Sequence, residues 1–101
     1  MAYLDIETRE TTEGVELLVS GELDLATVGT LQKCLAELDD SCRYVALDLA
    51  EVSFMDSAGV AELIRARQHA EPMMRAIVVR NPQPGVLRVL EMTGVGYLLS
   101  R

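Results

Sequence analysis

The stretch VSFMDSAGVAELIRARQH, from Val52 to His69, organises the rest of the sequence. Its apolar positions recur at helical spacing, and they are Val60, Leu63, Ile64 and the aliphatic stem of Arg67. Asp56 and Ser57 precede them, and both are residue types that accept hydrogen bonds from the unpaired N–H groups of a first helical turn. The pattern therefore predicts a helix that begins near Ser57.

Two interpretations of this turn stay open on the local sequence. Asp56 and Ser57 can simply cap the helix, which is a common use of these residues. Alternatively, Ser57 presents a hydroxyl at the positive end of a helix, where an added phosphate would meet free N–H donors and a favourable dipole. Gly59 leaves the backbone there open to close approach. Local sequence alone favours the plain cap.

Strand-like and helical segments alternate on both sides of this helix. The predicted order is a hairpin of Tyr3–Thr8 and Val15–Ser20, a helix from Val28 to Leu38 capped near Asp24 or Thr27, a strand Tyr44–Leu49, the helix Ser57–His69, a strand Ala76–Val79, a helix through Val86 and Leu90, and a short last strand at Tyr97–Leu99. The Tyr44–Leu49 run is mostly apolar, which is typical of a strand covered on both faces. These elements predict the α/β class, with one mixed β-sheet and helices packed against it.

The length and composition indicate one globular domain that spans residues 1–101. A chain of 101 residues can bury about two thirds of its unfolded surface. No segment resembles a signal peptide, and the longest plausible apolar run, Ala76–Val79, is too short to cross a bilayer. We therefore expect a cytoplasmic protein that does not associate with a membrane.

The negative charge is concentrated at the start of the chain. Of the net −7, residues 1–24 carry −6, from seven acidic residues and one arginine. Nucleic acids and anionic membranes are bound through basic patches, so this distribution argues against both as ligands. A basic protein partner would suit the acidic segment better, although the same acids could simply keep an exposed hairpin soluble.

Little in the sequence supports catalysis, a metal or a cofactor. The single histidine, His69, lies 12 residues after Ser57 on the same predicted helix, roughly 18 Å away and too far to act as its general base. Cys34 and Cys42 belong to no metal-binding pattern, and we interpret both as packing residues. No phosphate-binding or dinucleotide-binding glycine pattern is present. We expect no enzyme activity, no metal and no cofactor.

Four separated motifs carry a family resemblance. They are Gly21-Glu22-Leu23-Asp24 with Thr27, Val45-Ala46-Leu47-Asp48-Leu49, Val52-Ser53-Phe54-Met55-Asp56-Ser57-Ala58-Gly59, and Arg88-Val89-Leu90-Glu91-Met92-Thr93-Gly94-Val95. In this order and spacing they resemble the anti-sigma factor antagonist family, whose fold is the STAS domain. The resemblance covers nearly the whole chain, and it outweighs the local preference for a plain cap.

The resemblance implies a function and a set of site residues. In that family, the serine corresponding to Ser57 is phosphorylated. The unphosphorylated protein binds an anti-sigma factor, often itself a serine kinase, and thereby frees a sigma factor, while a serine phosphatase restores that form. The implied partner-binding residues are Gly21, Glu22, Asp24, Thr27, Asp56, Ala58 and Gly59.

Two departures and two alternatives accompany the resemblance. Ala58 stands where many relatives carry a second hydroxyl, so Ser57 is the better-defined acceptor. The family commonly has a further C-terminal helix, and this chain ends before one could form, which leaves open how the adjacent sheet face is covered and whether a dimer covers it. We expect a monomer or a weak dimer. The main alternative is an unphosphorylated STAS interaction module in a membrane transporter or a lipid-trafficking complex. A small serine hydrolase is a more distant one.

Overall fold

A computed structural model of the chain describes residues 3–99. The elements, in order, are β1 (Leu4–Glu10), β2 (Val15–Leu23), α1 (Val28–Ala36), β3 (Tyr44–Met55), α2 (Ser57–Ala70), the 3₁₀ turn η1 (Glu71–Met73), β4 (Ala76–Arg80), α3 (Pro84–Met92) and the 3₁₀ turn η2 (Gly96–Leu98). This order confirms the predicted alternation of strands and helices. Among the described helices, none is both long enough and apolar enough to cross a membrane.

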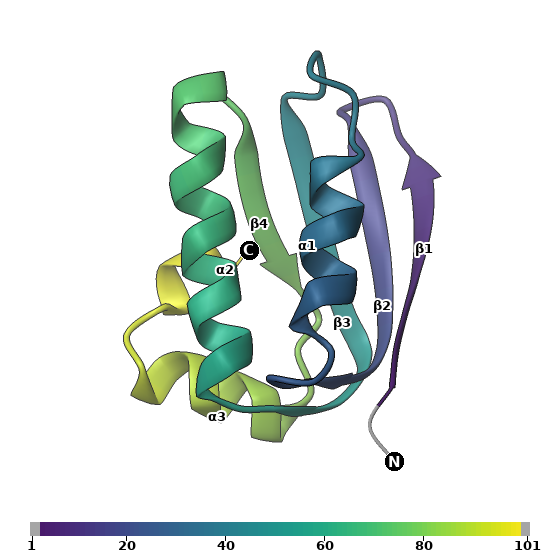
Figure 1. The fold of residues 1–101 in the computed structure, drawn as a ribbon. Coiled ribbons are helices and arrows are strands. Elements are labelled where there is room, and N and C mark those ends of the chain that lie inside the picture. Colours follow the sequence, from purple (N-terminus) through teal and green to yellow (C-terminus); the bar gives the residue numbers. More distant parts are fainter. Residues whose placement is uncertain (1–2, 100–101) are drawn as a thin grey trace.

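The four strands form one mixed sheet in the order β1-β2-β3-β4. β1 and β2 make an antiparallel hairpin, whereas β2, β3 and β4 run parallel to one another. In Figure 1, α1 and α2 lie side by side over the same face of this sheet, and α3 lies near the lower end, below α2. The predicted α/β class with a mixed sheet and packed helices is confirmed.

The core lies between the sheet and the helices. Strand residues that point toward the helices are fully buried, as the alternation of side chains along a strand requires, and they include Leu17, Val19, Val45, Leu47 and Val79. Leu31 of α1, Leu63 of α2 and Leu90 of α3 are each at most 1% exposed and close the core from the other side. The apolar spacing of these helices therefore marks their inner faces, as the sequence predicted.

The strand predicted at Tyr44–Leu49 is longer in the structure. β3 continues to Met55 because its pairing with β2 resumes after each of two register shifts, so that Glu22 pairs with Phe54 and Leu23 with Met55. The prediction that both faces are covered holds only in part. On the face away from α1 and α2, Ala46 is buried, but Tyr44 and Asp48 are only half-buried.

The prediction of a last strand at Tyr97–Leu99 is wrong. The chain forms the 3₁₀ turn η2 there, and Leu99 makes a single parallel bridge to Val79. The amide of Val95 donates to the carbonyl of Leu90, which folds the segment back against α3. This turn buries Leu98 and leaves Tyr97 58% exposed, an alternation that a short strand would also produce.

The two cysteines are free and half-buried, and both pack against the core. Burial raises the pKa of the Cys34 thiol, which also contacts the Thr8 hydroxyl at 3.9 Å. A raised pKa keeps the thiol protonated and unreactive at neutral pH. The prediction that both cysteines are packing residues is confirmed.

Candidate functional site

Asp56 and Ser57 have different roles at the start of α2. Asp56 is the N-cap residue, and its Oδ1 accepts hydrogen bonds from the amides of Ala58 at 2.9 Å and Gly59 at 3.3 Å. Ser57 is the first helical residue and is exposed, and its hydroxyl has no hydrogen-bond partner among residues 3–99. The cap is therefore supplied by the aspartate alone, which leaves the serine hydroxyl free at the surface.

This geometry corrects one expectation about a phosphate on Ser57. The sequence suggested that such a phosphate would meet free N–H groups in the first turn of the helix. Two of these groups, at Ala58 and Gly59, already donate to Asp56. A phosphate would have to compete with a carboxylate for them, and the two negative groups would repel each other. The helix start therefore offers a phosphate less compensation than expected.

The loop that leads into α1 lies beside this turn. The amide of Asp56 is 3.4 Å from the carbonyl oxygen of Leu23, which ends β2. Gly59 makes the approach closer still, because a Cβ at this position would lie 2.7 Å from the same carbonyl oxygen. A side chain there would push α2 away from β2. The carboxyl ends of β2 and β3 therefore form one continuous surface.

A network of hydrogen bonds fixes the shape of that loop. The buried hydroxyl of Thr27 donates to the carbonyl of Glu22 at 2.6 Å. The same hydroxyl accepts from the amide of Asp24 at 3.0 Å. The carboxylate of Asp24 accepts from the amide of Ala26. Gly21 supplies a left-handed backbone with φ +115°, and a Cβ there would lie 2.3 Å from the carbonyl oxygen of Tyr3.

The predicted site residues thus come together, but they differ in exposure. Gly21, Thr27 and Gly59 are buried, Glu22, Asp24, Asp56 and Ala58 are half-buried, and Ser57 is exposed. Gly21 and Glu22, which the sequence placed in a loop, belong to the end of β2. The buried residues shape the surface, whereas the others can touch a partner.

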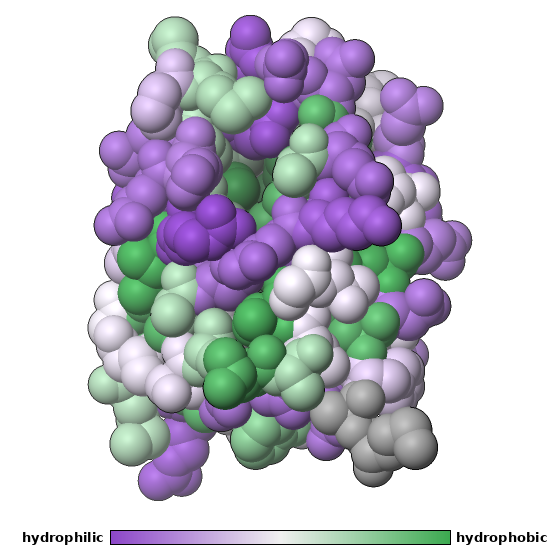
Figure 2. Space-filling model, viewed as in Figure 1, coloured by the Kyte–Doolittle hydropathy of each residue, from purple (hydrophilic) through white to green (hydrophobic). Residues whose placement is uncertain are grey.

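Two large exposed hydrophobic side chains at this end of the sheet were missed. Leu25 is 80% exposed in the loop before α1, and Phe54 is 47% exposed just before the Asp56 turn. Figure 2 shows apolar residues gathered in the lower centre of the view, where Figure 1 places the starts of α1 and α2. Leu25 keeps the three-residue spacing to Val28, so the apolar pattern of α1 gave no sign that its side chain points outward.

A polar cluster in the middle of α2 was also missed. Glu62 is only 3% exposed, and both of its oxygens accept from Arg65, from Nε to Oε1 and from Nη2 to Oε2, each at 2.8 Å. Gln32 of α1 donates to the same carboxylate at 2.9 Å. The hydrogen bond to Glu62 raises the pKa of the Arg65 guanidinium. Every buried polar side-chain atom in this part of the chain has a partner, as expected of a structural bridge.

Residues 3–99 contain no group of ligands suited to a metal ion.

Comparison with known proteins agrees with this fold. A protein-family model described as "Mlab, STAS domain" matches residues 6–100. The anti-sigma-B factor antagonist of Staphylococcus aureus strain NCTC 8325 is 29% identical over 97 residues, which cover 95% of this chain and 90% of that protein. The chain belongs to the STAS domain family.

Solved structures show the same architecture. The unphosphorylated anti-sigma factor antagonist SpoIIAA superposes with a TM-score of 0.76 at 22% identity, covering 95% of this chain and 86% of that one. An anti-sigma factor antagonist from Mycobacterium paratuberculosis gives 0.83 at 22% identity, covering 96% and 83%. The transporter SLC26A9 contains a similar domain, with a TM-score of 0.69 at 18% identity over 80% of this chain and 16% of that one. The resemblance inferred from the sequence is confirmed at the level of the family and its fold.

Proposed function

We propose that this protein is an anti-sigma factor antagonist whose unphosphorylated form binds an anti-sigma factor and releases a sigma factor. The observation that carries the proposal is the exposed Ser57 hydroxyl at the first position of α2, at the same end of the sheet as two exposed hydrophobic side chains. The S. aureus relative, similar over nearly its whole length, carries the same functional name. Such a regulator acts where sigma factors act, so the proposed location is the cytoplasm.

The residues of this surface divide by role. Leu25 and Phe54 are the proposed apolar contacts. Aromatic side chains such as Phe54 are enriched at protein interfaces, and Leu25 offers apolar area that a partner would remove from water. Asp24 and Asp56 add negative charge that steers a basic partner surface. The buried Gly21, Thr27 and Gly59 act indirectly, by holding the loop and the helix start in register. We call Leu25, Phe54 and Ser57, with these two aspartates, the Ser57 surface.

In the proposed mechanism, the anti-sigma factor is itself a serine kinase that phosphorylates Ser57. The phosphate ends this binding, and a phosphatase removes the phosphate and restores the binding. A phosphoserine adds about −1.5 to −2 charges. Asp56 lies next to Ser57 and already holds the nearby amides, so the added charge faces outward, largely uncompensated. A partner shaped for a bare hydroxyl would have to bury this charge. The fold itself makes few contacts with the hydroxyl and should hardly respond.

A capture experiment in the native cell tests the proposal. Tagged wild type should retain an anti-sigma factor, identified by mass spectrometry, and Phe54→Ser should lose it. Met74→Ser is a matched control, because Met74 is 83% exposed but lies in the turn after α2, away from the Ser57 surface. Retention by Phe54→Ser would contradict the proposed surface. Phosphate should map to Ser57 alone, and phosphate elsewhere that survives Ser57→Ala would contradict the proposed switch.

A second candidate is a STAS module of a membrane transport assembly. It is favoured only by the shared fold with the domain of the SLC26A9 transporter. The same capture experiment separates the two functions. Recovery of a membrane transport protein, unchanged by Ser57→Ala or by phosphorylation, would replace the regulatory proposal with this one.

A further inference from the structure

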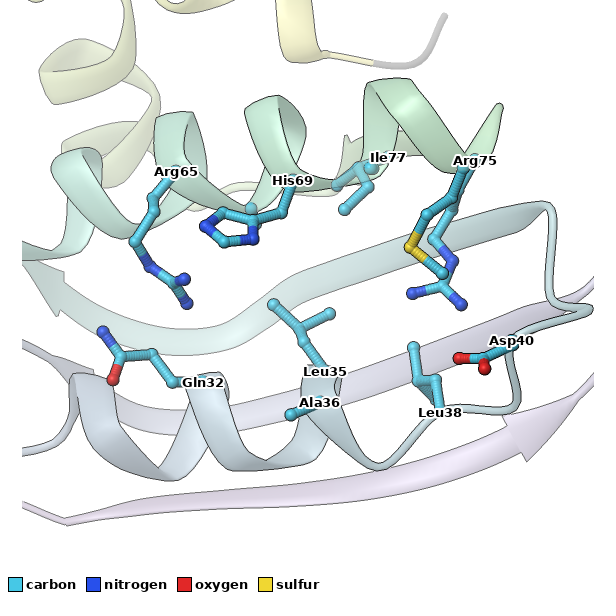
Figure 3. A pocket seen from close by; sticks show the side chains of 12 residues that line it. Gln32, Leu35, Ala36, Leu38, Asp40, Arg65, His69, Arg75 and Ile77 are labelled. Carbon is cyan, nitrogen blue, oxygen red and sulfur yellow. The ribbon is translucent and has the colours of Figure 1, made fainter.

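A cavity of about 220 Å³ lies between α1 and α2, away from the Ser57 surface. Figure 3 shows side chains from both helices pointing into it, with Arg65 and His69 on α2 and Gln32 and Leu35 on α1. Arg65 and His69 follow Ser57 by 8 and 12 residues on α2, which places them about 12 and 18 Å along the helix axis. The cavity is therefore a separate feature, and its use does not depend on the proposed function.

The gap exists because small side chains face each other and polar bridges hold both ends. Ala36 of α1 and Ala66 and Ala70 of α2 line the cavity, and their small side chains leave space between the larger ones around them. At one end, Gln32 and Arg65 are both bound to the buried Glu62. At the other end, Arg75 donates to the carbonyls of Cys42 at 2.8 Å and Asp39 at 2.9 Å. These bridges keep the cavity open.

The lining is apolar at its base and rich in donors at one end. Leu35, Leu38, Ala66 and Ile77 supply hydrocarbon surface. At the Glu62 end, Arg65 uses Nε and Nη2 to hold Glu62, and its Nη1 has no partner among residues 3–99. Gln32 has a second amide N–H, and His69 adds an imidazole. Asp40, the acidic residue of the lining, lies at the opposite end, near Arg75. Glu62 balances the charge of Arg65, so this end attracts an anionic group through its remaining donors rather than through net charge. These donors are Arg65 Nη1, the second N–H of Gln32 and the imidazole of His69, and Asp40 is far from them.

We propose that this cavity binds a small organic anion with a hydrocarbon body. Its anionic head would lie among Arg65, His69 and Gln32, and its apolar body would lie over Leu35, Ala66 and Ile77 toward Leu38. A volume of 220 Å³ equals about seven water volumes of roughly 30 Å³. This space suits a chain of about six to eight carbons. Charge-assisted hydrogen bonds to the head and burial of the chain are the two sources of affinity.

Titration with octanoate, followed by amide and methyl chemical shifts, tests this site. We expect saturable shifts at Leu35, Ala66 and Ile77, with a dissociation constant on the order of 1 mM, as a weak ligand of this size allows. Octylammonium and octan-1-ol have the same chain without the negative charge, and both should bind at least fivefold more weakly. Equal binding by either one, or shifts that never saturate, would overturn the proposal.

Two pairs of variants separate the head from the chain. His69→Ala should weaken octanoate binding about fivefold or more, whereas Gln68→Ala, the exposed neighbour outside the cavity, should not. Ala36→Leu should fill part of the cavity and abolish binding, whereas Ala61→Leu, exposed on α2 away from the cavity, should leave it intact. All four residues are exposed, so the fold should persist, as thermal melting would show. Octanoate binding unchanged in both His69→Ala and Ala36→Leu would overturn the assignment.

Discussion

The first turn of α2 and the middle of the same helix use polar residues in opposite ways. In the middle, Glu62 is almost fully buried, and Arg65 and Gln32 satisfy both of its oxygens. In the first turn, Ser57 is exposed and its hydroxyl has no partner among the described residues. Both are polar residues within six positions of one helix. Their surroundings show that one stabilises the fold and that the other is available for chemistry at the surface.

The comparison suggests a general criterion for this protein. A polar group whose hydrogen bonds are all made inside the fold costs stability when it is removed, because its partners lose their own bonds. A polar group that faces solvent costs almost nothing to remove, so a strong effect on binding would identify it as functional. Substitutions of Glu62, Asp56 and Ser57 test this criterion, and Gly59→Ala tests the close packing beneath the same turn. They follow roughly from the largest expected loss of stability to the smallest.

Glu62→Ala should lower the free energy of unfolding by about 2 kcal/mol. Removing one member of a buried ion pair typically costs more, but Arg65 is 41% exposed and can rehydrate. The melting temperature should fall by about 8–16 °C in a domain of this size. Glu71→Ala is the control, because Glu71 pairs with Arg67 while 63% exposed, and we expect a change below about 0.5 kcal/mol. Equal effects of the two substitutions would contradict the structural role of Glu62.

Gly59→Ala should cost about 1–3 kcal/mol, because the new Cβ would lie 2.7 Å from the carbonyl oxygen of Leu23 and 2.8 Å from Cγ of Met55. Gly29→Ala is the matched control within α1, where a Cβ meets nothing within 4 Å. It should stabilise the protein by up to about 1 kcal/mol, as alanine does in a helix. Denaturant unfolding measures both. If the two variants changed stability in the same direction, the close contact at Gly59 would not exist.

Asp56→Ala should lower stability by about 1 kcal/mol, because the amides of Ala58 and Gly59 lose their acceptor. Asp56→Asn keeps an acceptor and should cost less than about 0.5 kcal/mol. The same pair separates capping from charge in binding experiments, since only the asparagine variant keeps the helix start intact without the negative charge. A loss in Asp56→Asn as large as in Asp56→Ala would show that charge, rather than capping, stabilises the turn.

Ser57→Ala should change stability by less than about 0.5 kcal/mol, since the hydroxyl is exposed and makes no hydrogen bond to residues 3–99. Thermal melting in parallel with Glu62→Ala provides the sharpest form of the comparison. A fall in the melting temperature of more than about 8 °C would mean that Ser57 supports the fold. That result would contradict its proposed role as the site of a reversible switch.

Periodicity was enough to predict most of the fold. The apolar spacing of α2 and the alternation along β2 reflect burial against one common core, so both were recoverable from sequence. The turn at Tyr97–Leu99 was not, because three residues with one buried leucine fit a strand or a 3₁₀ turn equally well. The length of β3 depends on register shifts with β2, a pairing between distant segments that no local pattern encodes.

The sequence predicted where the Asp56 turn lies but not the contacts around it. The Asp56–Gly59 motif located the start of α2 correctly, because capping is a local property. The exposure of Leu25 and Phe54, and the bridge from Glu62 to Gln32, depend on how two distant segments meet. The sequence offered both Asp56 and Ser57 as acceptors for the first-turn amides, and the structure shows that Asp56 accepts from Ala58 and Gly59. These contacts determine which residues shape the Ser57 surface and which can touch a partner.

The affinity of the purified anti-sigma factor for unmodified and Ser57-phosphorylated protein tests the central claim most directly. We expect the phosphate to weaken binding more than a hundredfold, which corresponds to about 3 kcal/mol, and Ser57→Asp to weaken it less, because it adds one charge and a smaller group. Amide chemical shifts of the two free forms should differ only near Asp56–Glu62 and Gly21–Thr27. Equal affinity of the two forms, or shift changes spread across the sheet, would contradict a switch that acts by local charge at the Ser57 surface.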